Sequence, residues 1–378
     1  MKEIEYWIWI TSLEGLGAVK ARTLLKIYKH PEIIYHMSSQ ELVKTRLLTD
    51  KNIQELLNCN KRERISEIYS SMVKHNIKII SIFDEIYPDN LRQIYDPPVA
   101  LYYIGKFEIN AFIIAIVGSR KTTSYGARSA KKLSYELAAR GTRIVSGLAR
   151  GIDRIAHEGC LDAGGKTIAV LGCGLDNIYP PDNIGLFDRI VNSDGLILSE
   201  YPPGMPPLQR NFPARNRIIS GISSGVLVVE AAGRSGSLIT AGYALEQGRE
   251  VFAVPGNIDS AYSGGANQLI KDGAKMVLEV NDILEEFPWG EKIIADILKE
   301  DLSNNFIKQN SKSNFSIFRG LSTEEIRMVK IISNGVHHID EIIEKSNISA
   351  KEANNFLFML EMKGVISQLP GKIFELCL

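Results

Sequence analysis

The residues with the most specific chemistry are arginines in a stretch without acidic neighbours. Arg215 and Arg217 lie in Asn211–Gly221, NFPARNRIISG, and Arg210 directly precedes it. No Asp or Glu occurs from 205 to 225. A guanidinium offers a planar fork of N–H donors that fits phosphate oxygens, and clustered guanidiniums are unfavourable without a counter-anion. The stretch predicts a phosphate-binding site, and pairing with distant carboxylates is the alternative for each arginine.

A second anion-binding segment is predicted at Gly118-Ser119-Arg120-Lys121. From Gly118 to Tyr135 there are five basic residues and no acid. The small residues let an anion approach the backbone, and the helix expected to follow offers free amides at its N-terminus. The segment lacks the GxGxxG pattern, and no acid follows the next expected strand to hold a ribose hydroxyl. We therefore expect no dinucleotide cofactor.

Two further loops repeat this strand–loop–helix arrangement. Gly147–Asp153 contains Gly147 and Arg150, and Asp153 is expected to be a helix N-cap. His157 follows Asp153 by one helical turn, and we expect a packed, hydrogen-bonded histidine rather than a catalytic pair. The remaining loop places small polar residues at a helix start, which suits a phosphate. These residues are Ser235, Gly236, Ser237 and Thr240.

The composition bounds the class of protein. Lys and Arg number 44, as do Asp and Glu, so any polyanion site must be a local patch. The four cysteines are scattered, with no CxxC pair and no His at ligand spacing, so we expect no metal site. No stretch approaches the roughly twenty apolar residues that span a bilayer. We expect a cytoplasmic protein without a membrane contact.

The order of elements predicts an α/β fold. Apolar strands are expected at Phe112–Val117, Thr142–Ser146 and four later segments; these are Thr167–Leu171, Leu196–Ser199, Val226–Glu230 and Val251–Val254. Helical segments alternate with them, which is typical of an extended Rossmann-type open parallel sheet, here at 81–290.

Two flanking units are predicted. Residues 1–80 have helical periodicity, and the turn at Gly15–Gly17 is similar to a helix-hairpin-helix, with a plain helical turn the alternative. Residues 291–320 are polar and indicate a linker. Residues 321–378 indicate a winged helix, with helices opened by capping boxes at Ser322 and Ser349.

The central region resembles the DNA-processing protein A (DprA/Smf) family. The resemblance rests on the strings GSR, SGLARGID, FPARNRIISG, SGSLITAGYALEQGR and VFAVPG, in this order. It implies single-stranded DNA binding, protection of incoming DNA, loading of the RecA recombinase in natural transformation, and homodimerisation through the Rossmann domain. By motif, the implied DNA contacts are Arg120, Gln209, Arg210, Phe212, Arg215, Asn216 and Arg217. The basic residue expected before this string is Arg210, with the other side of Gln209 as the alternative register.

We therefore expect a DNA-binding protein without enzymatic activity. One alternative is a Rossmann-like nucleotide phosphoribohydrolase, a class that carries a Gly-Gly-x-Gly-Thr turn where this chain has Gly233–Ser237. Another alternative is an assembly scaffold that binds duplex DNA through the winged helix.

Overall fold

The structure is a computed structural model, and the described residues fall into two compact units. It describes residues 1–58, 61–109, 111–288 and, within 325–376, all but 326–327, 330, 333–336, 347, 364 and 370. The first unit holds 1–288 and the second 325–376. The predicted linker at 291–320 and the capping box at Ser322 lie outside the described residues. Within the described part, no helix combines the length and apolarity needed to cross a membrane.

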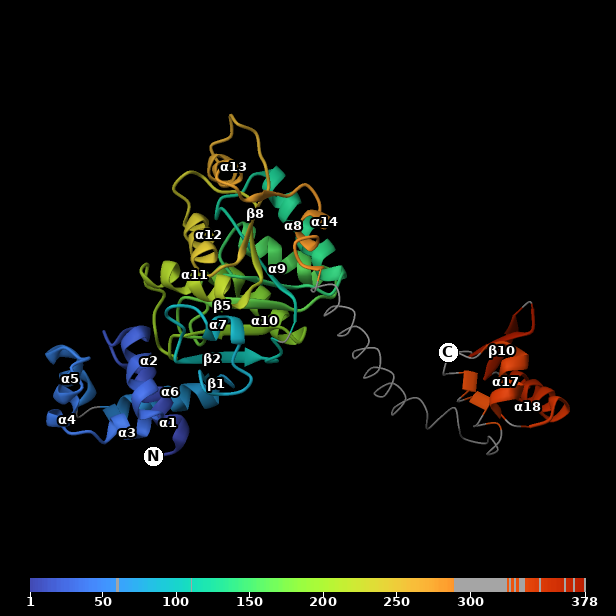
Figure 1. Cartoon of the computed structure of the whole chain (residues 1–378), viewed down its shortest axis with the longest axis horizontal. Coiled ribbons are helices and arrows are strands. Elements are labelled where there is room, and N and C mark those ends of the chain that lie inside the picture. Colours follow the sequence, from blue (N-terminus) through green and yellow to red (C-terminus); the bar gives the residue numbers. More distant parts are fainter. Residues whose placement is uncertain are drawn as a thin grey trace. The chain divides into compact units, whose positions relative to one another are not determined.

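The first unit combines helices with one large sheet (Figure 1). Its helices are α1 (Glu3–Ser12), α2 (Gly17–Tyr28), α3 (Pro31–Tyr35), α4 (Ser39–Lys44), α5 (Asp50–Leu56), α6 (Lys61–Lys74), α7 (Asp89–Arg92), α8 (Ser124–Ala139), α9 (Ile152–Asp162), the 3-10 turn η1 (Pro181–Asn183), α10 (Ile184–Asn192), α11 (Asn211–Ile222), α12 (Gly236–Glu246), α13 (Gly264–Lys271) and α14 (Asn281–Leu284). Its strands are β1 (Lys78–Ser81), β2 (Ala100–Gly105), β3 (Ile113–Val117), β4 (Arg143–Ser146), β5 (Thr167–Leu171), β6 (Leu196–Ser199), β7 (Gly225–Val228), β8 (Glu250–Ala253) and β9 (Lys275–Met276).

The strand order places a switch point beside β3. Among the described residues the sheet runs β1-β2-β6-β5-β4-β3-β7-β8-β9. Neighbours from β6 to β9 are parallel, whereas β1 and β2 pair antiparallel at one edge. The chain moves outward from β3 through β4, β5 and β6, and then returns to the other side of β3 with β7. Open parallel sheets bind ligands at the carboxyl ends of the strands beside such a reversal.

Helices cover both faces of the sheet because its central strands are apolar on both sides. In β3, Ile113, Ala115 and Val117 pack in one cluster with α11, α12 and α13. Ile114 and Ile116 face the other way and pack with α8, α9 and α14. Figure 1 shows α12 and α8 on opposite sides of the sheet. These findings confirm the predicted Rossmann-type fold class.

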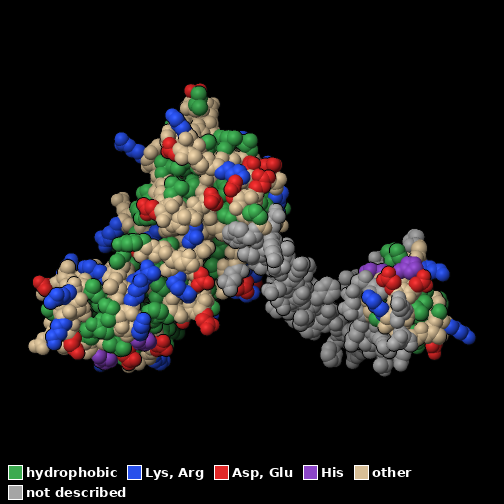
Figure 2. Space-filling view, viewed as in Figure 1, with side chains coloured by type: hydrophobic (Ala, Val, Ile, Leu, Met, Phe, Trp, Pro, Cys, Tyr) green, Lys and Arg blue, Asp and Glu red, His purple; other side chains and the backbone are tan. Residues whose placement is uncertain are grey.

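The N-terminal helices pack on the β2 and β6 side of the sheet. Residues of α1 and α2 share a core cluster with α10, β2 and β5. The predicted boundary at residue 80 falls inside β1, which pairs with β2 through Lys78–Ser81. On the face shown in Figure 2, Lys and Arg side chains are interspersed with Asp and Glu. No single-sign surface covers this view, as the balanced charge of the chain leads us to expect.

Two details differ from the sequence prediction. The stretch Asn211–Gly221, to which we assigned no regular structure, belongs to helix α11, with Pro213 in its first turn, where its missing N–H is tolerated. Asp153 is not the N-cap of α9. That position belongs to Gly151, whose φ of 76° favours glycine, and Asp153 lies in the first helical turn.

The second unit has the predicted winged-helix elements. Helices α17 (Ile339–Ser346) and α18 (Ala350–Met362) precede an antiparallel pair, β10 (Ile366–Leu369) and β11 (Ile373–Leu376). Ser349 and Glu352 form the predicted capping box at the start of α18. Lys363, directly after α18, forms an ion pair with Glu325, with 2.7 Å between Nζ and Oε1, so its charge is already paired.

Candidate nucleic-acid interface

A cavity of about 610 Å³ lies at the carboxyl ends of β3 and β7, the position of the switch point. It is formed by the loops that follow these strands, by the start of α11 and by the start of α12. We call it the switch-point pocket. Twelve of the sequence-predicted site residues line it: Gly118, Ser119, Arg120, Lys121, Gln209, Phe212, Arg215, Asn216, Ser235, Gly236, Ser237 and Thr240. Four predicted residues are absent from its lining: Gly147, Arg150, Arg210 and Arg217.

The loop after β3 presents Arg120 to this pocket. A Cβ on Gly118 would lie 2.6 Å from the Ile152 side chain, so only glycine lets this loop pack on α9. The Ser119 hydroxyl donates to the Lys121 carbonyl at 2.6 Å and shapes the turn. Arg120 is exposed, and its guanidinium lies 5.4 Å from the Phe212 ring centre, within cation–π range. No described carboxylate forms an ion pair with Arg120, so its charge is available to an anion.

The N-terminus of α8 is not the anion site that the sequence indicates. Glu230, which is buried at the end of β7, accepts hydrogen bonds there from the Thr122 hydroxyl at 2.8 Å and the Thr123 amide at 3.0 Å. A Cβ on Gly126 would collide with this carboxylate. The protein's own carboxylate therefore occupies the positive end of this helix dipole.

Arg215 lies at the floor of the pocket, only 3% exposed. Its Nη1 donates to the Gly147 carbonyl at 2.8 Å and also to the Val170 carbonyl, and its Nε donates to Asn216 Oδ1 at 3.2 Å. The described residues offer its Nη2 no hydrogen-bond acceptor. Burial lowers the pKa of Arg215 to about 10, which still leaves it protonated at neutral pH. Arg215 thus places a fixed positive charge, with one nitrogen free to donate, at the floor of the pocket.

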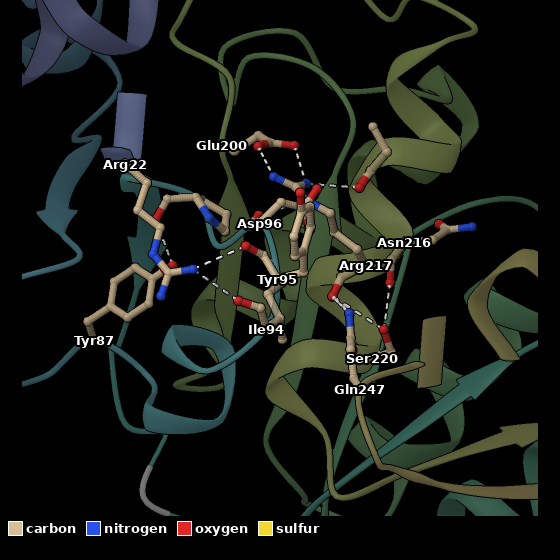
Figure 3. Close-up of polar contacts among 12 residues, drawn as sticks. Arg22, Tyr87, Ile94, Tyr95, Asp96, Glu200, Asn216, Arg217, Ser220 and Gln247 are labelled. Atoms are coloured by element: carbon tan, nitrogen blue, oxygen red, sulfur yellow. Dashed lines mark hydrogen bonds and ion pairs between the residues drawn. The ribbon is translucent and has the colours of Figure 1, made fainter. Parts of the chain in front are cut away.

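Arg217 points away from the pocket and pairs with carboxylates, the alternative stated above for each arginine, which corrects its assignment as a DNA contact. It is 4% exposed, and both of its terminal nitrogens donate to the Glu200 carboxylate at 2.7 Å. Its Nε lies 3.0 Å from Asp96 Oδ2. Figure 3 shows this guanidinium facing Glu200, while the Asn216 side chain extends in another direction. Burial alone would lower the pKa of Arg217, but Glu200 and Asp96 outweigh it and raise the pKa.

The loop after β4 supports the pocket by holding Arg215. Gly147 contributes its carbonyl to Arg215, and its amide donates to Asp153 Oδ2 at 3.2 Å. A Cβ on Gly147 would lie 2.5 Å from Arg215 Nη2, so this position must remain bare. Arg150 leaves the site and forms a two-point contact with Asp182, at 2.8 Å and 2.7 Å.

His157 is a packed core histidine, as predicted. Its Nδ1 lies 2.7 Å from the Thr167 hydroxyl, which donates to the Ile144 carbonyl, so Nδ1 is the protonated nitrogen. Burial lowers the pKa of His157 to about 3. Burial also raises the pKa of Asp153, against the opposing influence of Arg215. Neither residue is arranged as an acid–base pair.

The start of α12 closes the pocket on the β7 side. Ser235 is the N-cap, and its hydroxyl accepts from the Ser237 amide at 3.3 Å. Asn216 of α11 donates to the Gly236 carbonyl at 3.3 Å and links the two helices. The Gly236 amide, the positive end of the helix dipole, Arg120 and Arg215 therefore converge on one cavity.

Aromatic side chains in this pocket were missed by sequence reasoning. Tyr179 and Tyr262 line it together with Phe212, and the Tyr179 ring lies 5.6 Å from the Phe212 ring. Because the loops that carry these tyrosines show no periodic pattern, only the fold brings them to the site. Aromatic faces beside cations are suited to stacking bases next to phosphates.

Arg210 faces a different cavity, of about 470 Å³, between the turn after α1 and the start of α11. The adjacent Gln209 lines the switch-point pocket instead. The structure thus places neighbouring residues in two separate cavities, and Arg210 as a DNA contact before the FPARNR string stays a prediction.

A Rossmann-type unit with a basic pocket at its switch point and a winged-helix unit defines the class of this protein. Residues 78–288 match the family model of DNA recombination-mediator protein A, and residues 319–372 match the DprA winged helix domain. The chain belongs to the DprA/Smf family of DNA-processing proteins.

Curated relatives in other bacteria match long stretches of this chain. Protein Smf of Escherichia coli K12 is 37% identical over 98% of this chain and 95% of its own length. The DNA processing protein DprA of Streptococcus pneumoniae is 49% identical over 60% of this chain and 80% of its own length.

Solved structures of relatives share the fold. DNA processing protein A of Streptococcus pneumoniae aligns with a TM-score of 0.65 at 39% identity, over 76% of this chain and 99% of that one. DNA processing protein A of Helicobacter pylori, for which a single-stranded DNA binding mode is described, aligns with a TM-score of 0.50 at 32% identity. That alignment covers 59% of this chain and 96% of the Helicobacter pylori chain.

Proposed function

We propose that this protein binds single-stranded DNA in the switch-point pocket, with backbone phosphates on Arg120, Arg215 and the Gly236 amide at the start of α12. The observation that carries the proposal is the convergence of these donors with aromatic rings in one cavity. Among the described residues that line the pocket, Asp153 is the one acid, and Arg215 interacts electrostatically with it. The single-stranded DNA binding described for the Helicobacter pylori relative supports the same ligand.

A titration of labelled single- and double-stranded oligonucleotides at two salt concentrations tests this proposal. Arg120→Gln should weaken single-strand binding roughly tenfold, since a charge-assisted contact to phosphate is lost, and should leave the melting temperature unchanged. The slope of log affinity against log salt concentration should become smaller in magnitude by about 0.7, because one phosphate loses its cation. Salt-independent binding, or a preference for duplex DNA of equal length, would contradict the proposal.

The biological role we propose is protection of incoming DNA and loading of the RecA recombinase by a homodimer. Support comes from the family, and from the small extent of one pocket, because single-strand binders gain affinity by linking several sites along the backbone. Light scattering with and without oligonucleotide tests the dimer. Retention of the host recombinase on the immobilised protein tests the partner, and a monomer that retains no recombinase would leave a strand-binding module alone.

We propose binding without catalysis. A nucleotide phosphoribohydrolase would need a free carboxylate facing the bound sugar, and Glu230 is instead engaged by Thr122 and Thr123. Incubation with nucleoside monophosphates provides the test, and release of free base would support the phosphoribohydrolase alternative instead.

A further inference from the structure

We propose that a second cavity, beside the switch-point pocket, holds the next nucleotides of the same strand. This inference rests on the proposed function. The cavity, here named the Gly15 groove, has a volume of about 470 Å³. One wall is the turn Glu14–Gly17 between α1 and α2, and the other is the start of α11 with Arg210 and Asn211. Lys51 of α5 also lines it.

Two cations in the groove are unpaired. Arg210 and Lys51 are both exposed, and no described residue forms an ion pair or hydrogen bond with either. Glu14 and Glu200 also line the groove, but both have partners. Glu14 lies 3.7 Å from Arg64, and Glu200 is held by Arg217. The two free cations are therefore available to phosphates.

Asn211 supplies an independent indication of a ligand. It is 5% exposed and lines the groove, and its Nδ2 has no acceptor among the described residues. Buried side-chain donors nearly always have a partner, which can be a protein group, a water or a ligand. Nδ2 is closed to solvent in this structure, so an acceptor oxygen of a base or phosphate would complete this amide once the groove wall moves aside.

The turn of α1 and α2 provides a bare backbone surface. Gly15 and Gly17 have φ values of 76° and 69°, and a Cβ on either would meet no atom within 4 Å. No side chain caps the N-terminus of α2. Asn52 fixes the turn by donating to the Gly15 carbonyl at 3.0 Å. A phosphate can approach this backbone closely, and the first amides of a helix have no acceptor within it.

The two cavities are neighbours along α11, which is why we assign the groove to the same strand. Gln209 and Phe212 line the switch-point pocket, whereas Arg210 and Asn211 line the Gly15 groove. The inner and outer residues of one short segment, 209–212, therefore face different cavities. A strand that leaves the pocket beside Gln209 meets Arg210 next, so the N-terminal helices extend the binding surface.

The test compares charge-neutralising variants of the full chain on a labelled oligothymidylate of about sixteen nucleotides. Arg210→Gln with Lys51→Gln should weaken binding roughly a hundredfold and lower the slope of log affinity against log salt concentration by about 1.4, as expected for two phosphates. Lys74→Gln, which removes one positive charge from an exposed site outside both cavities, should bind as the unmodified protein does.

Asn211→Leu gives a second measurement. Loss of affinity with an unchanged or raised melting temperature is expected, because removal of an unpaired buried donor does not destabilise the fold. If the double variant binds with the affinity and salt dependence of Lys74→Gln while Arg120→Gln binds weakly, the Gly15 groove is not a binding site. The switch-point pocket would still be one. Failure of the unmodified protein to bind any single strand would overturn both.

Discussion

Arg215 and Arg217 are separated by one residue in α11, and their environments differ completely. Arg215 contacts two backbone carbonyls at the floor of the pocket and keeps a spare donor. Arg217 faces the opposite direction and is fixed by Glu200 and Asp96. Residues two apart on a helix point to different sides, so a shared motif does not give them a shared role. Arg217 positions α11 against the loop that carries Glu200.

Arg217→Gln should therefore destabilise the protein rather than remove a DNA contact. The change leaves the Glu200 carboxylate largely buried without its partner, which costs about 3–5 kcal/mol. Urea unfolding measures this loss. The double variant Arg217→Gln with Glu200→Gln should recover part of it, because the largely buried charge of Glu200 is removed and only the more exposed Asp96 loses its partner. An unchanged unfolding free energy together with lost strand binding would restore Arg217 as a ligand contact.

His157 makes stability depend on pH below neutrality. Its pKa is about 3 in the folded protein, so between pH 6.5 and 3 the unfolded chain binds the extra proton and stability decreases as pH falls. From pH 7 to pH 5 this residue should remove about 2 kcal/mol from the unfolding free energy. The pKa of Asp153 shifts in the opposite direction, because burial raises it.

The variant His157→Gln isolates the histidine. It can still donate to Thr167, and it does not titrate, so the decrease from pH 7 to pH 5 should be about 2 kcal/mol smaller than in the unmodified protein. Parallel pH profiles for the two proteins would show that His157 is not the titrating group.

At the scale of elements, the loop between β4 and α9 depends on a close approach. Gly151 has a φ of 76°, and a Cβ there would overlap the Ser119 carbonyl and lie 2.7 Å from the Arg120 carbonyl. Gly151→Ala should displace the Arg120 loop and reduce both stability and strand affinity. Gly164→Ala is the matched control, with a φ of 72° and no atom within 4 Å. It should cost only about 1 kcal/mol of backbone strain and leave affinity intact. Equal effects of the two changes on affinity would show that the close approach is unimportant.

The elements differ in how far the sequence predicts them. Strands β5 and β6 match their predicted bounds because each is a continuous apolar run between helical segments. Helix α11 was missed because Pro213, three β-branched isoleucines and several small polar residues give it a weak helical signal. Sequence also placed the loop after β3 at the site, because parallel strands end at one edge. It did not identify Glu200 as the partner of Arg217, because that contact depends on tertiary packing.

At the scale of the whole molecule, balanced charge coexists with a locally basic cavity. The chain carries equal numbers of acidic and basic residues, yet Arg120, Lys121 and Arg215 meet in the switch-point pocket. Glu230, which follows β7, does not neutralise them because it is engaged at the start of α8. Attraction of a polyanion is therefore short-ranged, and binding at physiological ionic strength, where the screening length is about 8 Å, should depend on direct contacts.

The fragment Met1–Pro288 should fold and bind single-stranded DNA without the winged-helix unit. All residues that line the switch-point pocket and the Gly15 groove lie within it, and it forms a compact unit with its own core clusters. Its affinity for a short oligonucleotide should be within about twofold of the full chain, well under the tenfold that a lost contact produces. Its thermal unfolding should remain cooperative, since α14 packs Ile283 and Leu284 into the sheet core. Calorimetry and anisotropy on the purified fragment measure both. A folded fragment that binds weakly would show that the winged helix contributes a strand contact, whereas an aggregated fragment would show that the second unit completes the core.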